Sequence, residues 1–562
     1  MMFLLVTNAL DGFYPLVLKR AIDQVAAKAS TSDIVWTAFL FFIMMSGLAC
    51  TRYLWRFYFG RYHTFAAEDL RTRIFTHLTQ MGPNYFKKNS VGELISLMVN
   101  DIQSFRNGIG SGVLVFVDGL IVISITLPMM IYLSPAWTWK TLILLPTVPF
   151  LIRSITNRIY DTFAVQQERL AELSGSSQEI VAGIRVIKSF AQEKNRLSIY
   201  NKQSRTYELS CNKTALWDSL FHPVMEFGVA SGSVILLFVC APDIFSGIAS
   251  VGSLVAFHRY IQKMTWPMTA LGYGWSQYQK GMASLARIFD LLTQKTDIPD
   301  LGKTLVSEFQ SLSVRHLSYQ FADAVQPVLK NLSFEIKAGE FIGVVGPVGS
   351  GKTTLLHLLA KLYPASNGTV LLNGIPLEDI AASSLRKLIA LVPQEAFLFS
   401  ETIATNMSYG LQDLATPEIL SKWAGAVDIR EEIESLPGTY SAELGERGVN
   451  LSGGQKQRLT IARALITQAP FVMLDDSLSA VDTRTEQLIK AAITGTQRGH
   501  NTLLIVAHRL SSIENADRII VLSEGQIEAI GSHAELLRNS KTYRAMANGQ
   551  NYSLPPVLEG AP

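Results

Sequence analysis

Two long apolar segments near the start of the chain constrain its fold more than any other feature. Residues 34–59 carry no charge except Arg52 and Arg56, and residues 111–134 carry only Asp118. About 20 helical residues are needed to cross a hydrocarbon core of about 30 Å. The two arginines lie near one end of their segment, where long side chains can reach the lipid headgroups. Both segments are therefore predicted to be transmembrane helices.

Four further segments bring the predicted number of spans to six. Residues 1–18 lack the basic start and the small-residue cleavage site of a signal peptide, so this segment is expected to remain as a span. Residues 141–152 are uncharged but short for a crossing, and they need the flanking helix to complete it. Residues 216–241 and 251–275 are interrupted by polar side chains, which is typical of helices that line an interface or a cavity.

The composition indicates that only part of the chain lies in lipid. Hydrophobic residues make up 48% and charged residues 17%, which is apolar for a soluble protein but too charged for a chain buried wholly in a bilayer. Polar stretches at 61–107 and 157–213 are compatible with helices that extend into the cytoplasm. A net charge of only +3 gives no electrostatic support for nucleic-acid binding, and the three scattered cysteines suggest neither disulfides nor zinc.

A change of composition after Asp290 marks a domain boundary between residues 293 and 306. Short apolar runs separated by turns follow it, which is the pattern of an α/β domain. We predict an all-α transmembrane domain at residues 1–295, an α/β domain at 306–548 and a C-terminal tail at 549–562.

A phosphate-binding loop follows a predicted buried strand at residues 340–345 and precedes a leucine-rich helix. Its glycines allow backbone amides to turn toward phosphates, and the helix N-terminus adds positive potential. Lys352 supplies a point charge, and Thr353 is placed to ligate Mg²⁺. The alternative, a plain glycine turn, does not explain the full spacing of this Walker A sequence, which is Gly346-Pro347-Val348-Gly349-Ser350-Gly351-Lys352-Thr353-Thr354.

Residues 471–475 form an apolar run that ends in Asp475, as in a Walker B strand. A carboxylate at the edge of a sheet can hold the same metal ion through water. Together these two motifs predict that the α/β domain at 306–548 is a P-loop NTPase, although alone they are compatible with many such enzymes. Because this domain needs ATP, the chain is expected to be an integral protein of the inner or plasma membrane with the domain in the cytoplasm. The decisive sequence lies between the two motifs and begins a helix with small residues able to meet a phosphate, namely Leu451-Ser452-Gly453-Gly454-Gln455.

This last sequence resembles the signature of the ATP-binding cassette (ABC) family, and the resemblance covers nearly the whole chain. It implies that the signature of one cassette closes over ATP bound to the Walker A loop of another, so a second half-transporter is the expected partner. The resemblance further implies four roles. The adenine would stack on Tyr319, Gln394 would contact Mg²⁺ and water, Asp482 would lie in the D-loop, and His508 would be the γ-phosphate switch.

The membrane half resembles the exporters of this family. Residues 181–190 and Asn100-Asp101-Ile102 are similar to exporter intracellular loops, and Gly445-Glu446-Arg447-Gly448 is similar to the segment that senses them. Fusion of the membrane half ahead of the cassette also favours export, with an amphipathic or lipophilic cargo. The family commonly begins with an amphipathic elbow helix, whereas this sequence begins directly with the first span.

The sequence departs from the family at Asp476, where the catalytic base is usually a glutamate. A misplacement of about 1 Å can cost on the order of 10²-fold in rate, so this shorter side chain is expected to be a poor base. The resemblance favours the degenerate half of a heterodimer, and a homodimer that uses Asp476 as a slow base is the alternative. An ATP-gated channel or regulator is a further alternative, and a soluble P-loop kinase is opposed by the spans and the signature.

Ionisable and aromatic residues near the spans allow two interpretations each. Acids in apolar spans often mark a substrate path, but they also occur at helix ends. A group of aromatics on one span could contact cargo, although an interfacial belt is the commoner arrangement. The acids are Asp11, Asp118, Asp218 and Glu226, and the aromatics are Trp55, Phe57, Tyr58 and Phe59.

Overall fold

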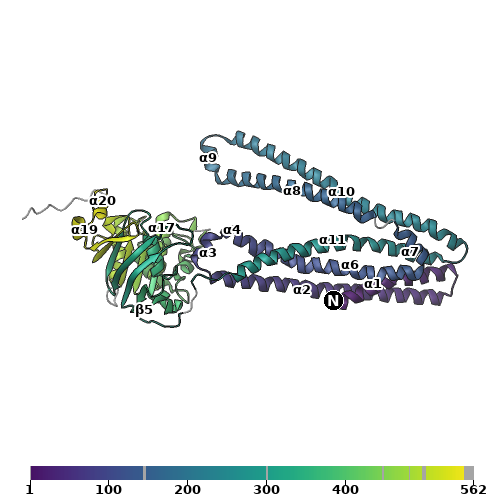
Figure 1. Cartoon of the computed structure of the whole chain (residues 1–562), viewed down its shortest axis with the longest axis horizontal. Helices are drawn as coiled ribbons and strands as arrows, with labels where there is room; N and C mark the ends of the chain where they lie inside the picture. The colour runs from purple at the N-terminus through teal and green to yellow at the C-terminus, as the bar shows by residue number, and fades with distance from the viewer. Residues whose placement is uncertain are drawn as a thin grey trace, which may run out of the picture. The chain divides into compact units, whose positions relative to one another are not determined.

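The computed structural model describes residues 2–143, 147–298, 302–445, 448–479, 481–495 and 501–549. The chain divides into two compact units, of which the first is helical and the second α/β, as the fold class predicted (Figure 1). Unit 1 comprises Met1–His77 and Val91–Gln294, and unit 2 comprises Leu78–Ser90 and Lys295–Pro562. The tail at 550–562 lies outside the described residues.

Unit 1 consists of long helices joined by short turns. The polar stretches predicted to be helical are indeed helical, because α2 continues well past its apolar part and α8 and α10 are long (Figure 1). The elements are α1 (Met2–Ala26), α2 (Thr31–Thr79), α4 (Val91–Ser96), the π-helical turn η1 (Leu97–Asp101), α5 (Ile102–Asn107), the π-helical turn η2 (Gly108–Gly112), α6 (Val113–Leu133), α7 (Pro135–Leu142), α8 (Thr147–Ala182), α9 (Ile184–Ser189), α10 (Glu193–Phe245) and α11 (Val251–Thr293).

Four helical stretches of the described chain are long and apolar enough to cross a membrane: α1, α2, the continuous run Val91–Leu133, and α10. The other two predicted spans fall on α11 and on the α7–α8 region, where residues 144–146 are outside the described part. The count of six spans therefore stays a prediction. In Figure 1, α8 and α10 run side by side and, with α9 at their tip, diverge from α1, α2, α6 and α11.

The core of unit 1 lies where α6, α7, α10 and α11 meet. Trp137, Phe257 and Tyr260 are fully buried there. Their polar atoms are satisfied, as burial in an apolar setting requires. The Trp137 indole donates to Asp243 at 2.6 Å, and the Tyr260 hydroxyl donates to the Gly12 carbonyl at 2.7 Å.

Unit 2 contains two sheets. A six-stranded sheet has the order β10-β9-β3-β8-β7-β6, in which β3, β6, β7, β8 and β9 are parallel to one another and β10 is antiparallel to β9 at the edge. A four-stranded antiparallel sheet has the order β2-β1-β4-β5. The strands are β1 (Ser311–Tyr319), β2 (Leu329–Lys337), β3 (Phe341–Val345), β4 (Val370–Leu372), β5 (Ile375–Pro376), β6 (Ile389–Val392), β7 (Phe471–Asp475), β8 (Thr502–Val506), β9 (Arg518–Ser523) and β10 (Gln526–Gly531).

Helices cover the larger sheet and create two apolar cores. Strands β7 and β8 are buried along their whole length, as expected for parallel strands covered on both faces. The helices are α12 (Lys352–Leu359), α13 (Ala382–Leu388), α14 (Ile403–Ser408), α15 (Pro417–Ala426), α16 (Arg430–Glu434), α17 (Gly453–Leu465), α18 (Thr483–Thr494), α19 (His533–Asn539) and α20 (Lys541–Gly549), with 3₁₀ turns η3 (Leu377–Asp379), η4 (Thr439–Ser441) and η6 (Leu510–Ser512).

The segment Leu78–Ser90 belongs to unit 2 although it precedes most of unit 1 in sequence. It contains a short helix, α3 (Pro83–Lys88), which begins after Gly82 with proline at its first position. The Asn84 amide donates to the Asp297 carboxylate at 2.7 Å, and Lys88 lies 3.6 Å from Asp323. This segment was expected to be part of one long polar helical stretch, and its packing against the α/β unit was not foreseen.

Candidate nucleotide-binding site

The Walker A and Walker B residues lie at one edge of the six-stranded sheet. Strands β3 and β7 are both parallel neighbours of β8, so their carboxyl ends emerge close together. The phosphate loop follows β3 and leads into α12, while β7 ends at Asp475. Ligands of open α/β sheets bind at this edge, beyond the carboxyl ends of the strands.

The loop needs glycine at Gly351, which precedes α12 and has a φ of 94°. A left-handed backbone strains any other residue, and a Cβ atom at this position would come within 2.5 Å of Leu329 Cδ2. Gly349 is also left-handed, with a φ of 83°. These two positions allow the loop to curl back on itself before the helix starts.

Lys352 is buried, with 7% of its surface exposed, and its ammonium group is held inside the curled loop. Its Nζ atom donates to the carbonyl oxygens of Gly346 and Pro347, each at 2.8 Å. Burial lowers the pKa of Lys352, whereas the nearby carboxylates of Asp475 and Asp476 act in the opposite direction. The loop therefore places a positive charge close to the Walker B acids.

Thr353 connects the two motifs, since its hydroxyl donates to the Asp475 carboxylate at 3.2 Å. Asp475 is only 2% exposed, and burial raises its pKa. A hydroxyl beside a carboxylate is a pair of hard oxygen donors, the kind that Mg²⁺ uses together with phosphate oxygens. The Ser350 hydroxyl is also buried and has no partner among the described residues. This unpaired hydroxyl and the Thr353–Asp475 oxygens fit a bound, metal-complexed phosphate.

Three other predicted catalytic residues follow neighbouring strands of the same sheet. Asp476 comes directly after β7 with a φ of 46°, and its backbone N–H donates to Val506 of β8 at 2.9 Å. Gln394 lies just beyond β6 and is exposed, and His508 lies just beyond β8 and is partly buried. The sheet thus gathers Lys352, Thr353, Asp475, Asp476, Gln394 and His508 at one edge.

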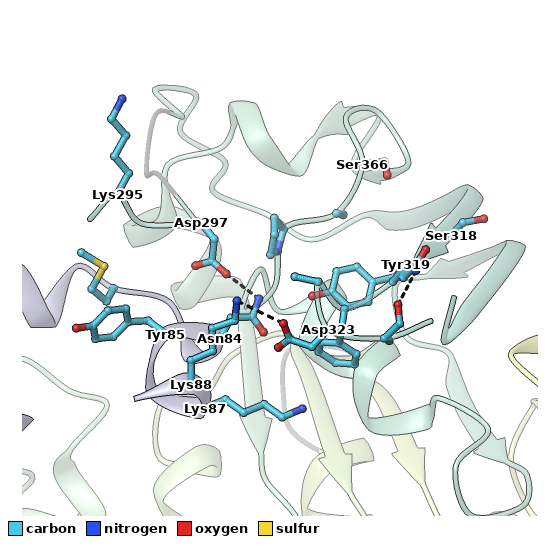
Figure 2. Close-up of a pocket in the computed structure, with 17 residues that line it drawn as sticks. Asn84, Tyr85, Lys87, Lys88, Lys295, Asp297, Ser318, Tyr319, Asp323 and Ser366 are labelled. Atoms are coloured by element: carbon cyan, nitrogen blue, oxygen red, sulfur yellow. Dashed lines mark hydrogen bonds and ion pairs between the residues drawn. The ribbon is translucent and has the colours of Figure 1, made fainter. Parts of the chain in front are cut away.

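Tyr319 ends β1 and packs in an aromatic group. Its ring stacks on Tyr363 with centroids 5.8 Å apart, and it forms an edge-to-face pair with Phe321, with centroids 5.0 Å apart. A cavity of about 920 Å³ opens beside this group, with Asn84 and Asp297 on another wall (Figure 2). Lys87 of α3 lies 4.5 Å from the centre of the Phe321 ring. The 78–90 segment therefore packs beside the tyrosine expected to stack on adenine.

We expect Tyr319→Ala to raise the Kd of this chain for ATP roughly tenfold, because stacking of a base on an aromatic ring is worth about 1–3 kcal/mol. Tyr319→Phe keeps the ring and should stay within about twofold of the native Kd. Equilibrium titrations of ATP binding to both purified variants check this. An unchanged Kd in Tyr319→Ala would show that the base lies elsewhere.

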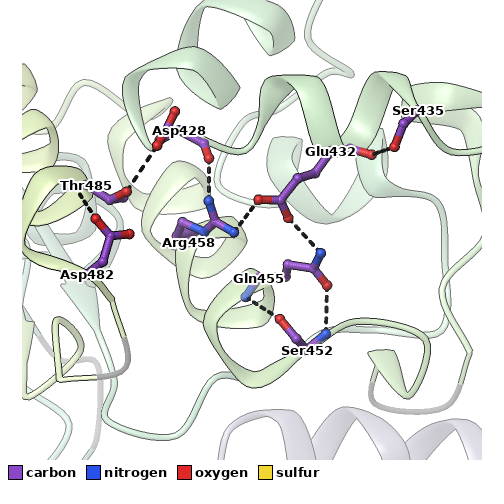
Figure 3. Close-up of polar contacts among 8 residues, drawn as sticks. All are labelled: Asp428, Glu432, Ser435, Ser452, Gln455, Arg458, Asp482 and Thr485. Carbon is purple, nitrogen blue, oxygen red and sulfur yellow. Dashed lines mark hydrogen bonds and ion pairs between the residues drawn. The ribbon is translucent and has the colours of Figure 1, made fainter.

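The signature sequence forms the start of α17, where Ser452 is the N-cap. Gln455 and Ser452 form a capping box, with Ser452 N–H donating to the Gln455 amide oxygen at 2.7 Å (Figure 3). Gln455 also donates to Glu432 at 2.6 Å, and Arg458 donates to the other oxygen of Glu432 at 2.6 Å. These bonds fix the orientation of the helix start, leaving Ser452 and Gly453 exposed.

The same polar network reaches the D-loop. Arg458 donates to the Asp428 carbonyl, and the Asp428 carboxylate accepts from the Thr485 hydroxyl at 3.1 Å (Figure 3). Asp482 is the N-cap of α18 and accepts from the Thr485 backbone N–H at 3.0 Å, which lowers the pKa of its carboxyl. Two sequence-distant motifs, the signature and the D-loop, are thus held by one set of side chains.

Glu432→Ala is expected to lower ATP turnover of the assembled transporter roughly tenfold, because each hydrogen bond to a charged group is worth about 1.5–3 kcal/mol. Glu431 precedes it on α16 and is exposed, so Glu431→Ala serves as the matched control. The two variants are compared by steady-state ATPase and by nucleotide binding, which should be preserved in both. Equal turnover in both variants would contradict a positioning role for Glu432.

The structure brings together most, but not all, of the predicted site residues. Gly346, Gly349, Ser350, Gly351, Lys352, Thr353 and Thr354 form the loop and first turn of α12. In the described part of the chain, no hydrogen bond or ion pair joins the signature residues Ser452, Gly453, Gly454 and Gln455 to that loop.

Sequence reasoning missed five residues near these motifs: Asn84, Asp297, Tyr363, Asp428 and Glu432. Only Asn84 had a signal in the sequence, because Gly82-Pro83 interrupts the predicted helix just before it.

Comparisons with known proteins identify the family of this chain. Residues 1–268 match the ABC transporter transmembrane region, and residues 329–479 match the ABC transporter family model. A probable multidrug resistance ABC transporter ATP-binding/permease protein, YheI of Bacillus subtilis, is 34% identical over 96% of this chain and 93% of its own length. An ATP-dependent lipid A-core flippase of Pasteurella multocida is 32% identical over 96% of this chain and 93% of its own.

A solved structure of a bacterial Atm1-family ABC exporter with ATP bound shares the fold. Its TM-score is 0.75 at 24% identity, covering 99% of this chain and 98% of that one. The chain belongs to the ABC transporter family, as its motifs predicted. It is an exporter half-transporter, an inner-membrane protein whose cytoplasmic cassette binds ATP and couples ATP hydrolysis to transport.

Proposed function

We propose that this chain exports an amphipathic or lipophilic substrate as the degenerate half of a heterodimer, with ATP and Mg²⁺ at its cassette. One observation supports the claim that ATP drives this transport. The Thr353 hydroxyl contacts Asp475 beside Lys352, so the phosphate loop is joined to the Walker B acid. The names of the two relatives, a multidrug transporter and a lipid A-core flippase, support a lipophilic cargo by similarity.

In this proposal, each residue at the sheet edge has a separate task. Lys352 offers its charge to the terminal phosphates, and the amides after Gly349 orient them. Thr353, Asp475 and Gln394 would hold Mg²⁺, which neutralises the charge that develops on the phosphates. His508 would contact the γ-phosphate, and Asp476 would orient the attacking water.

The signature belongs to a second site in this proposal. Its capping box presents Ser452 and Gly453 to solvent, and a Cβ atom at Gly453 would meet nothing within 4 Å. An exposed helix start with small residues suits the phosphates of ATP bound to another cassette. The Glu432 network would hold that surface ready for a partner chain.

The heterodimer part depends on Asp476. Its side chain is one methylene shorter than glutamate, and the backbone at this position is already left-handed, with a φ of 46°. The shorter side chain cannot reach as far as a glutamate would, and phosphoryl transfer depends steeply on such positioning. A site of this kind would retain ATP, while the intact signature of this chain would complete the site that hydrolyses it.

The test of this proposal is the composition of the native complex. The tagged chain is extracted from its own membrane in lipid nanodiscs and its dimers are identified by native mass spectrometry. The proposal predicts a pair of unequal chains, the second with glutamate after its Walker B aspartate. A dimer of two identical chains would overturn the heterodimer and leave the homodimer with Asp476 as a slow base.

A further inference from the structure

The tyrosine expected to stack on adenine lies between the phosphate loop and the 78–90 segment. Tyr319 pairs with Leu329 in the β1–β2 ladder, and a Cβ atom at Gly351 of the phosphate loop would come within 2.5 Å of Leu329 Cδ2. The backbone of Tyr319 is therefore close to the loop. Burial raises the pKa of the Tyr319 hydroxyl, and a hydrogen bond with the Asn84 side chain acts in the opposite direction. The ring thus points from the phosphate loop toward Asn84.

The Asp297 carboxylate lies at the hydroxyl end of this ring. Its Oδ2 atom accepts a hydrogen bond from the Asn84 amide at 2.7 Å (Figure 2). Burial is the main cause that raises the pKa of Tyr363, which stacks on Tyr319, and the negative charge of Asp297 adds to it. Asn84, Asp297 and Tyr319 all line the cavity of about 920 Å³. The cavity therefore has a carboxylate beside the end of the aromatic ring.

This carboxylate is accessible and can accept a further hydrogen bond. Asp297 is exposed, and the Asn84 amide is its one hydrogen-bond donor among the described residues. A carboxylate has about four lone-pair sites on its two oxygens. Asp297 therefore offers acceptor atoms to a molecule that enters the cavity.

The covalent structure of a nucleotide decides which edge of its base would meet Asp297. The sugar is attached at N9 and leads to the phosphates, so the opposite edge of a purine, with C6 and N1, points away from the phosphate loop. On Tyr319 this edge points toward the hydroxyl end of the ring, where Asn84 and Asp297 lie. In adenine the C6 position carries an amine, which is a donor, and an ionised carboxylate is an acceptor only.

We propose that Asp297 accepts a hydrogen bond from the C6 amine of adenine and makes this cassette prefer adenine nucleotides. Asn84 is a positioning residue, because its amide holds the carboxylate at the end of the Tyr319 ring. Guanine has a carbonyl oxygen at C6, which is an acceptor and cannot form this bond. The inference rests on the proposed function, since it requires that ATP bound to the phosphate loop stacks its base on Tyr319.

Purine riboside 5′-triphosphate, which is ATP without the C6 amine, isolates this hydrogen bond. The full chain is purified alone in lipid, so that only its own cassette contributes, and the Kd of each nucleotide with Mg²⁺ is measured by isothermal titration calorimetry. We expect ATP to bind roughly tenfold more tightly than the analogue, the lower end for a hydrogen bond to a charged group, because Asp297 is exposed to water. GTP should also bind more weakly than ATP.

Asp297→Ala should weaken the binding of ATP roughly tenfold and leave the Kd of the analogue within about twofold of the native value. The two nucleotides would then bind equally, whereas a merely structural role would weaken both alike. Asp323→Ala is the matched control, because Asp323 lines the same cavity and its carboxylate, 79% exposed, lies 3.6 Å from Lys88. This variant should keep the native preference for ATP.

Three results would overturn the proposal. Equal Kd values for ATP and the analogue in the native chain, which needs no substitution, would show that the amine is not read. A preference that persists in Asp297→Ala would assign the amine to another residue. Tighter binding of GTP than of ATP would mean that the carboxylate meets the N1 and C2 positions of a guanine instead.

Tyr319→Ala distinguishes this inference from the stacking on which it rests. This variant should weaken the binding of ATP and of the analogue by the same factor. If it changed neither Kd, the base would lie elsewhere, and both the stacking role of Tyr319 and the role of Asp297 would be wrong. If it weakened both while the native chain bound them equally, stacking would hold and only the role of Asp297 would be wrong.

Discussion

Lys352→Ala is expected to reduce ATP turnover of the assembled transporter roughly tenfold or more, because ATP retained at this chain's site keeps the two cassettes closed and a charged contact to its phosphates is worth about 1.5–3 kcal/mol. Lys352 is buried in the phosphate loop, where it bonds two carbonyl oxygens of that loop. No other described lysine occupies this loop. Steady-state release of inorganic phosphate from the purified complex in lipid measures the effect.

The matched control is Lys387→Ala, which removes an exposed lysine from α13 of the same unit. Its turnover should stay within about twofold of the native value. If the two variants had the same activity, the phosphate loop of this chain would play no part in turnover, and the heterodimer would depend on the partner's loop alone.

Asp476→Glu is expected to raise turnover by this chain's own site tenfold or more. The added methylene moves the carboxylate toward the position that the family's usual glutamate occupies, and a shift of about 1 Å can change a rate on the order of 10²-fold. The measurement is ATPase activity of this chain purified alone in lipid, beside the native sequence. Native activity near zero, with a gain in the variant, is the expected pattern.

Asp476→Asn distinguishes a degenerate ATP site from a site in which Asp476 acts as a slow catalytic base. A degenerate site predicts that this variant changes little, because the native carboxylate contributes little. If the native chain alone hydrolyses ATP briskly and Asp476→Asn abolishes that activity, Asp476 is a working base and the homodimer becomes the leading account.

Much of the nucleotide site could be predicted from sequence because its residues are local. The phosphate loop, the Walker B run and the signature are each continuous and follow predicted elements, so strand order alone brings Lys352 and Asp475 together. Their roles stay proposals. The sequence also shows that aspartate replaces the family's usual glutamate at Asp476, because this residue directly follows the Walker B Asp475.

The unpredicted contacts are those between distant segments. Glu432 and Asp428 support the signature helix from α16 and the turn before it, and nothing in their own sequence distinguishes them from other surface acids. Asn84 reaches Asp297 across 213 residues, which no periodicity reveals. Residues 446–447 and 480, which the exporter and D-loop resemblances include, lie outside the described residues.

The central claim is that the assembled transporter, with ATP bound to this chain, moves its substrate against a gradient. Its most direct test uses inside-out vesicles from the native membrane, carrying either the native chain or Lys352→Ala, loaded externally with a fluorescent lipophilic dye. The account predicts ATP-dependent accumulation of dye above the external concentration with the native chain only, and none with a non-hydrolysable ATP analogue. Dye that merely equilibrates, or accumulates equally with Lys352→Ala, would contradict it and favour an ATP-gated channel or a transporter driven by other means.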